Sequence, residues 1–136
     1  MTDFSEDKIK DFKYWEVYAA QNQGYLGRCV IWCKREGAED VEDATKEEWL
    51  EFLEIILELK GAVKKAFDAD WFNYAFLGNV MRHLHCHLVP RYKSKREFNG
   101  FGFEDKLWGH NYKTDRSFET PKELRMAIKE EIRKNL

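Results

Sequence analysis

Long apolar runs, an export signal and a strong net charge are all missing from this sequence. No apolar stretch approaches the ~20 residues that span a bilayer, and residues 1–6 lack the basic, apolar and small-residue order of a secretory signal. The formal net charge of −2 gives no general attraction to nucleic acid or to an anionic membrane. We therefore expect a cytoplasmic protein with neither nucleic acid nor membrane as a partner, in which any anion site is local.

Cysteine is also scarce. Cys29, Cys33 and Cys86 form an odd set in a chain without an export signal, so free thiols are expected rather than a disulfide framework. On a strand, Cys29 and Cys33 would lie ~13 Å apart, which disfavours a zinc ion shared between them.

The apolar content is nevertheless sufficient for one core. A hydrophobic fraction of 43% with 15% aromatic residues argues against disorder. A length of 136 residues fits one compact domain better than two, and no repeat, linker or low-complexity segment divides the chain. We expect a single domain over residues 1–136.

The first half of the chain predicts a hairpin followed by a long helix. Residues 14–20 and 26–34 are strand-like and are separated by turn residues. Thr45 and Glu48 have the spacing of a capping box, so a helix is expected to begin there. Apolar residues then recur every three or four positions and form the stripe expected to face the core: Trp49, Phe52, Leu53, Ile56, Leu59, Val63 and Phe67.

The second half predicts another hairpin, from residues 71–78 and 83–90, and a second helix. Thr120, Pro121 and Glu123 suggest a helix start with a second capping box. Its expected buried stripe is Leu124, Ile128 and Ile132. Residues 5–13 are expected to hold a short helix, and residues 93–105 a mobile basic loop. The fold class is therefore α+β, with an antiparallel sheet of about five strands, one long central helix and a C-terminal helix.

Three of the four histidines lie in one short segment, as His83, His85 and His87. Alternation along a strand would put these imidazoles on one face and the intervening Leu84, Cys86 and Leu88 on the other. Neighbouring imidazoles disfavour each other's protonation, so such a row has a cost unless an anion or a metal uses it. The row predicts a functional site.

Zinc and phosphate are the two uses that compete. On a strand, His83 and His87 lie ~13 Å apart at Cα, whereas zinc needs nitrogens at about 2.0–2.1 Å. Two of the histidines could chelate, but the remaining ligands would have to come from elsewhere, and no second Cys/His cluster stands out. An extended row of donors matches an extended anion such as a polyphosphate, so phosphate is favoured.

The run from His83 to Val89 resembles the motif of the histidine triad (HIT) family, in which histidines alternate with apolar residues. Pro90, Arg91 and Tyr92 extend the match, and the preceding residues 73–79 are similar to those of bacterial and archaeal HIT hydrolases related to diadenosine polyphosphate hydrolases. The resemblance spans about residues 14–92.

This resemblance implies a nucleotide hydrolase or transferase that cleaves a phosphoanhydride or phosphoramidate bond. The middle histidine, His85, would attack the α-phosphorus and form a nucleotidyl-histidine, while His83 and His87 would bind phosphate oxygens. We expect a backbone carbonyl to accept a hydrogen bond from the second ring nitrogen of His85 and so to fix its tautomer.

The resemblance also assigns substrate contacts and partners. Asn79 matches an amide that contacts phosphate, and Asn22 stands where relatives hold the ribose hydroxyls, although it could equally be an ordinary turn residue. Apart from the resemblance, Arg82 and Arg91 flank the histidines and, with Lys93, Lys95 and Arg96, would supply a local positive field, although a solvated surface position is the alternative for each of them alone. No cofactor is required, a divalent cation bound to the substrate phosphates is compatible with the mechanism, and a homodimer is implied.

Two alternatives stay open. The protein could bind nucleotides without turning them over, or it could be a zinc-binding module. His110 lies outside the motif and is interpreted as a surface or packing histidine.

Overall fold

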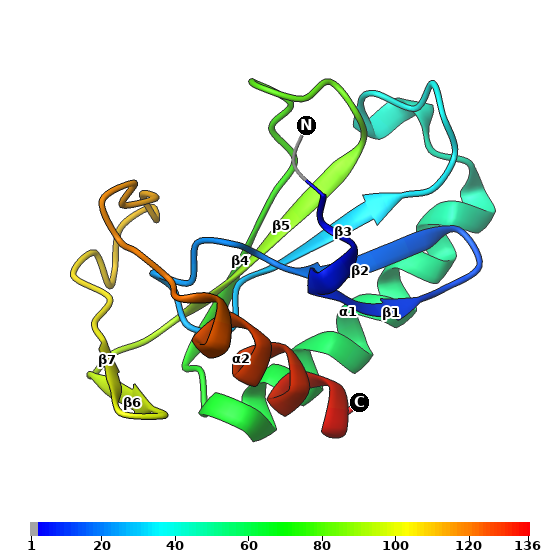
Figure 1. Ribbon diagram of the computed structural model, residues 1–136. Coiled ribbons are helices and arrows are strands. Elements are labelled where there is room, and N and C mark those ends of the chain that lie inside the picture. Colours follow the sequence, from blue (N-terminus) through cyan, green and yellow to red (C-terminus); the bar gives the residue numbers. More distant parts are fainter. Residues whose placement is uncertain (1–2) are drawn as a thin grey trace.

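The computed structural model describes residues 3–136. It is built on a five-stranded antiparallel sheet with the strand order β1-β2-β3-β5-β4 (Figure 1). The strands are β1 (Lys8–Asp11), β2 (Trp15–Ala19), β3 (Cys29–Cys33), β4 (Trp71–Ala75) and β5 (His85–Arg91). Two α-helices, α1 (Lys46–Phe67) and α2 (Lys122–Lys134), complete the main body. The α+β fold predicted from the sequence is confirmed.

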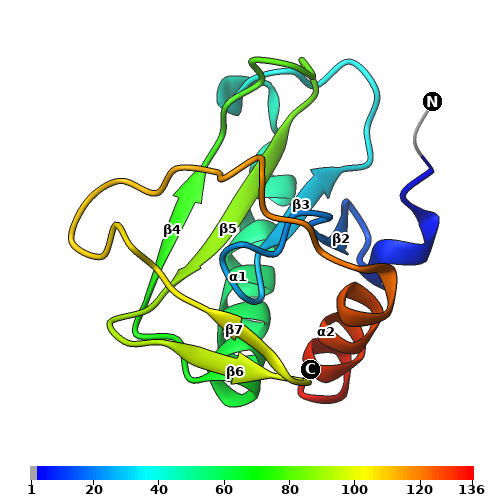
Figure 2. The ribbon, with the colours of Figure 1, turned by 60° about the vertical axis from the view of Figure 1, so that its left-hand side comes forward.

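Smaller elements connect these parts. Two 3-10 turns, η1 (Ser5–Asp7) and η2 (Val41–Asp43), precede β1 and α1, and β6 (Arg96–Phe98) pairs with β7 (Phe101–Phe103). The segment 104–119 then crosses in front of β4 and β5, on the side of the sheet away from α1 (Figure 2). One face of the sheet is therefore covered by helices and the other by this irregular segment.

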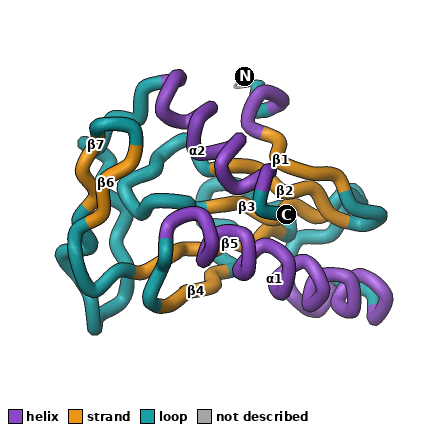
Figure 3. Tube along the Cα trace, turned by 90° about the horizontal axis from the view of Figure 1, so that it is seen from below, coloured by secondary structure: helices purple, strands orange, loops and turns teal. Residues whose placement is uncertain are grey.

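The core lies between the sheet and both helices (Figure 3). Alternate residues of each central strand point into it, among them Trp15, Val17, Ile31, Cys86 and Leu88, all of which are buried. The stripe of α2 that the sequence predicts is buried as well. Neither helix is long and apolar enough to cross a membrane in the part of the chain that the structure describes.

Helix α1 begins with the predicted capping box. Thr45 Oγ1 accepts the N–H of Glu48 at 3.1 Å, and Glu48 Oε1 accepts the N–H of Thr45 at 2.8 Å. The predicted apolar stripe is correct except at Leu53, which is exposed, while Ile55 is fully buried. Helix α1 therefore presents a slightly rotated face to the sheet.

Gly27, two residues before β3, packs against the end of α1. Its φ is +88°, and a Cβ at this position would lie 3.0 Å from Phe67 Cδ2 and 3.1 Å from Val63 Cγ1. A residue with a side chain would meet both a strained backbone and the last turn of α1. The chain consequently enters β3 in contact with the helix.

Three local predictions are wrong. Residues 5–13 form η1 and β1 instead of a helix, because pairing with β2 and the burial of Ile9 outweigh a weak helical pattern. The stretch 93–105 contains the β6–β7 hairpin, whose turn has positive φ at Asn99 (49°) and Gly100 (81°), as a type I′ turn requires. At α2, Pro121 is the N-cap without a side-chain bond, because Thr120 Oγ1 accepts the N–H of Gln23.

Candidate active site

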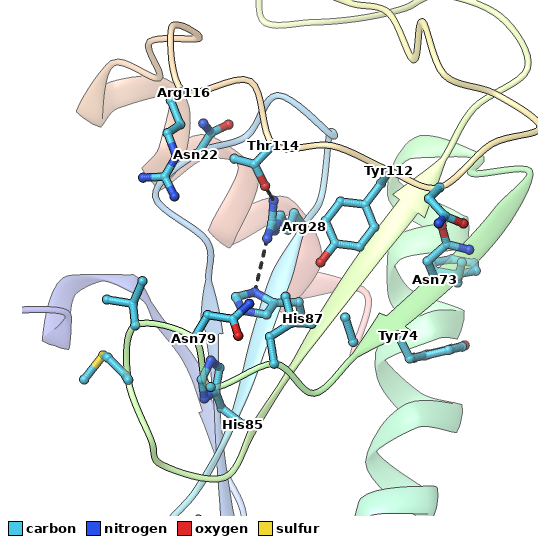
Figure 4. A pocket seen from close by; sticks show the side chains of 17 residues that line it. Asn22, Arg28, Asn73, Tyr74, Asn79, His85, His87, Tyr112, Thr114 and Arg116 are labelled. Carbon is cyan, nitrogen blue, oxygen red and sulfur yellow. Dashed lines mark hydrogen bonds between the residues drawn. The ribbon is translucent and has the colours of Figure 1, made fainter. Parts of the chain in front are cut away.

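A cavity of 1070 Å³ opens on the face of the sheet away from the helices. Its walls come from β4, β5, the residue before β3, the segment 77–81 and residues of the segment 111–116 (Figure 4). Among the predicted site residues, His85, His87, Asn79 and Asn22 line it, whereas His83 and Arg91 do not. Strand alternation thus brings two of the three imidazoles into one cavity.

The ring of His85 has a defined hydrogen-bond partner on one side. Nδ1 lies 2.6 Å from the backbone oxygen of His83, which as an acceptor requires the proton to be on Nδ1. In the neutral ring the lone pair is therefore on Nε2, the nitrogen that a nucleophilic role would use. This is the carbonyl contact that the sequence analysis expects.

His83 lies outside the strand that carries the other two histidines. Pairing between β3 and β5 starts at Trp32 and His85, so β5 begins after His83. The His83 ring stacks on Trp32 with centroids 4.2 Å apart, and its Nε2 is hydrogen-bonded to the backbone oxygen of Cys33. The prediction that one strand presents all three rings to one pocket is therefore wrong for His83.

His87 is paired with an arginine that the sequence analysis did not select. Arg28 Nη2 lies 3.3 Å from His87 Nδ1, and Nη1 of the same guanidinium donates to Thr114 Oγ1 at 2.7 Å. The guanidinium also lies over the ring of Tyr112, 5.2 Å from its centroid. Arg28 is thus held from three sides at the cavity wall.

Burial and the charge of Arg28 together keep His87 neutral. Burial of the ring lowers the pKa of His87 to about 4, with further contributions from the positive charge of Arg28 and from His85. Because the guanidinium can only donate, Nδ1 must accept, and the single proton of the neutral ring lies on Nε2. His85 and His87 therefore adopt opposite tautomers, one with a free Nε2 and the other with an Nε2–H donor.

Asn22 and Asn79, the two amides predicted to bind substrate, both line the cavity but differ in their hydrogen bonding and exposure. Asn22 donates from Nδ2 to the oxygen of Asp115 at 2.8 Å and accepts the N–H of Gly24 on Oδ1 at 2.8 Å, so its turn role is real. Asn79 is exposed at the cavity wall in the loop between β4 and β5, close to His85 and His87 (Figure 4). Of the two, Asn79 is the better placed to donate a hydrogen bond from its amide to a ligand in the cavity.

Arg91 is a structural residue in this fold. Its side chain is 4% exposed and binds both oxygens of Asp105, at 2.7 and 3.0 Å. The remaining donors bind Asn73 Oδ1, Leu107 O and His110 O. All five N–H groups are used, which leaves none for a phosphate. Arg96, assigned to the same positive field, is likewise bound to backbone oxygens and to Asp70.

Sequence reasoning missed the residues of the cavity that come from outside the histidine motif. Arg28, Asn73, Tyr112, Thr114 and Arg116 all line it. Only Arg28 left a usable signal, because counting back in twos from Trp32 places it on the face of β3 that borders the histidines. Within residues 3–136, no three His, Cys, Asp or Glu side chains are grouped so that they could hold a metal ion.

Comparison with known proteins decides the family. The profile of the HIT domain matches residues 11–94, which include the histidines, Arg28 and Asn79. The chain belongs to the HIT domain family. This family includes nucleotide hydrolases and transferases, and some of its members are non-catalytic.

Solved structures agree on the fold. A hypothetical histidine triad nucleotide-binding protein from Sulfolobus tokodaii is 18% identical, with a TM-score of 0.74 over 95% of this chain and 82% of that one. A histidine triad protein from Sinorhizobium meliloti is 20% identical, with a TM-score of 0.72 over 100% of this chain and 96% of that one. No curated protein sequence matches significantly.

Proposed function

We propose that this HIT protein is a nucleotide hydrolase or transferase that cleaves a phosphoanhydride or phosphoramidate bond through a nucleotidyl-His85 intermediate. The observation that supports this most directly is the 2.6 Å contact between His85 Nδ1 and His83 O. It places the proton of the neutral ring on Nδ1, so that the lone pair of that tautomer is on Nε2, the atom that would attack phosphorus.

In the first step, the Nε2 lone pair of His85 forms a bond to the α-phosphorus while the bond from phosphorus to the leaving group breaks. The Nε2–H of His87 donates to a phosphate oxygen or to the departing atom, and the fixed charge of Arg28 offsets negative charge nearby. In the second step, the oxygen of a water molecule attacks phosphorus, the P–N bond breaks, and the proton that the water loses replaces the one that His87 gave to the leaving group or passes to solvent. A nucleoside monophosphate leaves and neutral His85 is restored. No cofactor is needed, and a divalent cation would arrive on the substrate phosphates.

Replacing His85 with Asn tests the proposal. Asparagine is of similar size but cannot carry the nucleotidyl group, so turnover of dinucleoside polyphosphates and nucleoside phosphoramidates should be lost, far beyond the ~10²–10⁴-fold effect of losing a proton-transfer group. Circular dichroism and the affinity for a nucleoside monophosphate should be unchanged. Products are identified by mass, and acid quench of the wild type should trap an adduct on His85.

Two other outcomes of the His85→Asn test would each contradict part of the proposal. A wild-type protein that binds nucleotides without turnover, and that binds them equally well after His85→Asn, is a non-catalytic nucleotide-binding protein. Near wild-type turnover in the variant, or an adduct on His83, would refute the assignment of the nucleophile.

We also propose that the protein acts in the cytoplasm as a homodimer. Leu50, Leu53 and Leu57 recur every three or four residues on α1 and are all exposed, an apolar row typical of an interface. Leu53→Glu with Leu57→Glu should convert a dimer to a monomer in light scattering after size exclusion. A wild-type monomer at micromolar concentration would contradict this.

A further inference from the structure

A second cavity lies directly beside the catalytic one. Its volume is 500 Å³, and Asn73 and Asn111 line both cavities. The register of the sheet places Ala75 opposite His87, Asn73 opposite Val89 and Trp71 opposite Arg91. Alternate residues of β4 therefore lead from His87 to Trp71 over ~13 Å, so the two cavities form one groove along the strand.

Two tryptophans line the second cavity. The side chains of Trp71 and Trp108 are 63% and 36% exposed, and neither belongs to the hydrophobic core. Lys60 Nζ lies 5.7 Å from the centroid of the Trp71 ring, and partly exposed indole rings of this kind are typical platforms for stacking a nucleobase. A cavity of this size falls within the range of small-molecule sites.

The Trp108 wall is held in place by buried polar groups. Arg91 donates to the backbone oxygens of Leu107 and His110, on either side of Trp108. The same guanidinium is paired with Asp105. The segment that carries Trp108 is consequently anchored to β5, and the second cavity exists before any ligand binds.

Charge in this cavity suits a phosphate chain that enters from the catalytic side. The Lys93 ammonium lies 5.8 Å from the centroid of Trp108 and lines the cavity. The one carboxylate in its wall, Asp70, is bound by Arg96 at 3.2 Å and by the N–H of Lys93 at 2.8 Å. Asn73 accepts from Arg91 through Oδ1, so its Nδ2 group is the part available to a ligand.

The groove has two distinct ends relative to His87. Asn22 and Arg116 lie on one side of that ring, and Asn73 and Tyr112 lie on the other (Figure 4). The second cavity adjoins the Asn73 end. If the transferred nucleotide occupies the end with Asn22, the leaving group must extend past Asn73.

We infer that the cavity between Trp71 and Trp108 is a stacking subsite for the nucleobase of the leaving group, so that the preferred substrate is a dinucleoside polyphosphate. This rests on the proposed function of His85. It assigns the second half of the substrate to residues outside the histidine motif.

The test compares substrates that differ only in the second nucleoside. Diadenosine tetraphosphate and adenosine 5′-tetraphosphate, together with their guanine counterparts, are hydrolysed by wild type and by Trp108→Ala. The variant should lose about 5- to 100-fold in kcat/KM on the dinucleotide and less than about 2-fold on the mononucleotide. Trp108→Phe should restore most of the loss, because phenylalanine keeps a face for stacking. Phe101→Ala, which removes an exposed aromatic residue outside both cavities, is the matched control.

Binding to the His85→Asn protein provides a readout that needs no turnover. Calorimetry should show tighter binding of the dinucleotide than of the mononucleotide, and Trp108→Ala should abolish that difference. If no variant or wild type shows turnover but this binding preference is found, the subsite stands and the proposed catalysis fails. Equal losses on both substrates, or no loss on the dinucleotide, would overturn the subsite while leaving the catalytic proposal intact.

Discussion

Nη2 of Arg28 lies 3.3 Å from Nδ1 of His87, so a permanent positive charge touches one histidine of the cavity. An ordinary histidine changes charge near pH 6.5, whereas this one is held neutral well below that value by burial, by Arg28 and by His85. The pair therefore combines a charge that does not vary with pH and a neutral imidazole with a fixed tautomer. Phosphate would meet both groups together.

Removing the charge of Arg28 should raise the pKa of His87. We expect Arg28→Gln to move it upward from about 4, though not fully to 6.5, because burial is the larger cause and remains. The measurement is the pH titration of the His87 ring by NMR. Arg116→Gln is the control, since Arg116 lines the cavity without contacting His87. An unchanged titration in Arg28→Gln would show that the contact has no electrostatic effect.

The lowered pKa of His87 should also make the free energy of unfolding depend on pH. Between pH values of about 4 and 6.5, unfolded His87 binds a proton that the folded protein does not bind, so this residue makes the free energy of unfolding rise with pH in that window. Its contribution is complete above pH 6.5 and is lost as the pH falls. Urea unfolding at several pH values should show a shallower rise for Arg28→Gln than for wild type. Parallel curves would contradict the assignment.

The pair of Arg91 and Asp105 should be costly to break. Their side chains are 4% and 0% exposed, so Asp105→Ala leaves an uncompensated buried charge and should lower the free energy of unfolding by about 3–5 kcal/mol. Glu6→Ala, which breaks an exposed pair with Lys122, should cost under about 1 kcal/mol. Urea denaturation measures both, and similar costs would refute the structural role given to Arg91.

Among Lys93, Lys95 and Arg96, we expect Lys93 to make the main electrostatic contribution to polyphosphate binding. It lines the second cavity, whereas Lys95 lines neither cavity and the donors of Arg96 are bound elsewhere. Lys93→Gln should weaken binding of a dinucleoside polyphosphate by up to about 5-fold at low ionic strength and much less at high salt. Lys95→Gln is the matched control. Equal effects of the two variants would indicate a diffuse field.

The features that could be predicted from the sequence depend on interactions between residues close together in the chain. Alternation along β5 correctly separated His85 and His87 from the buried Cys86 and Leu88. The Thr45–Glu48 capping box marked the start of α1 because both of its hydrogen bonds lie within one turn. The type I′ turn at Asn99 and Gly100 is equally local, and the Asn-Gly pair could have predicted the β6–β7 hairpin.

The features that the sequence did not predict depend on contacts between residues far apart in the chain. Arg28 is 59 residues from His87 in sequence, and Tyr112 and Thr114 approach Arg28 from a segment with no strand or helix pattern. Arg91 resembled a phosphate ligand because it follows the motif, but its partner Asp105 lies beyond a hairpin that was expected to be a loop. The strand period places Arg28 on the face that borders the histidines, but no local pattern predicts its contacts with Thr114 and Tyr112 or the pair of Arg91 and Asp105.

Gly27 packs against the end of α1 and directly precedes Arg28. Phe67 and Val63 leave no space for a Cβ at Gly27, and Arg28 is the next residue. A displacement of that turn would therefore move the backbone next to Arg28, whose guanidinium contacts His87. The pKa of an imidazole on the open face of the sheet thus depends on a residue held by a helix end on the opposite face, and we expect a substitution at Gly27 to change that pKa without removing any side chain from the cavity.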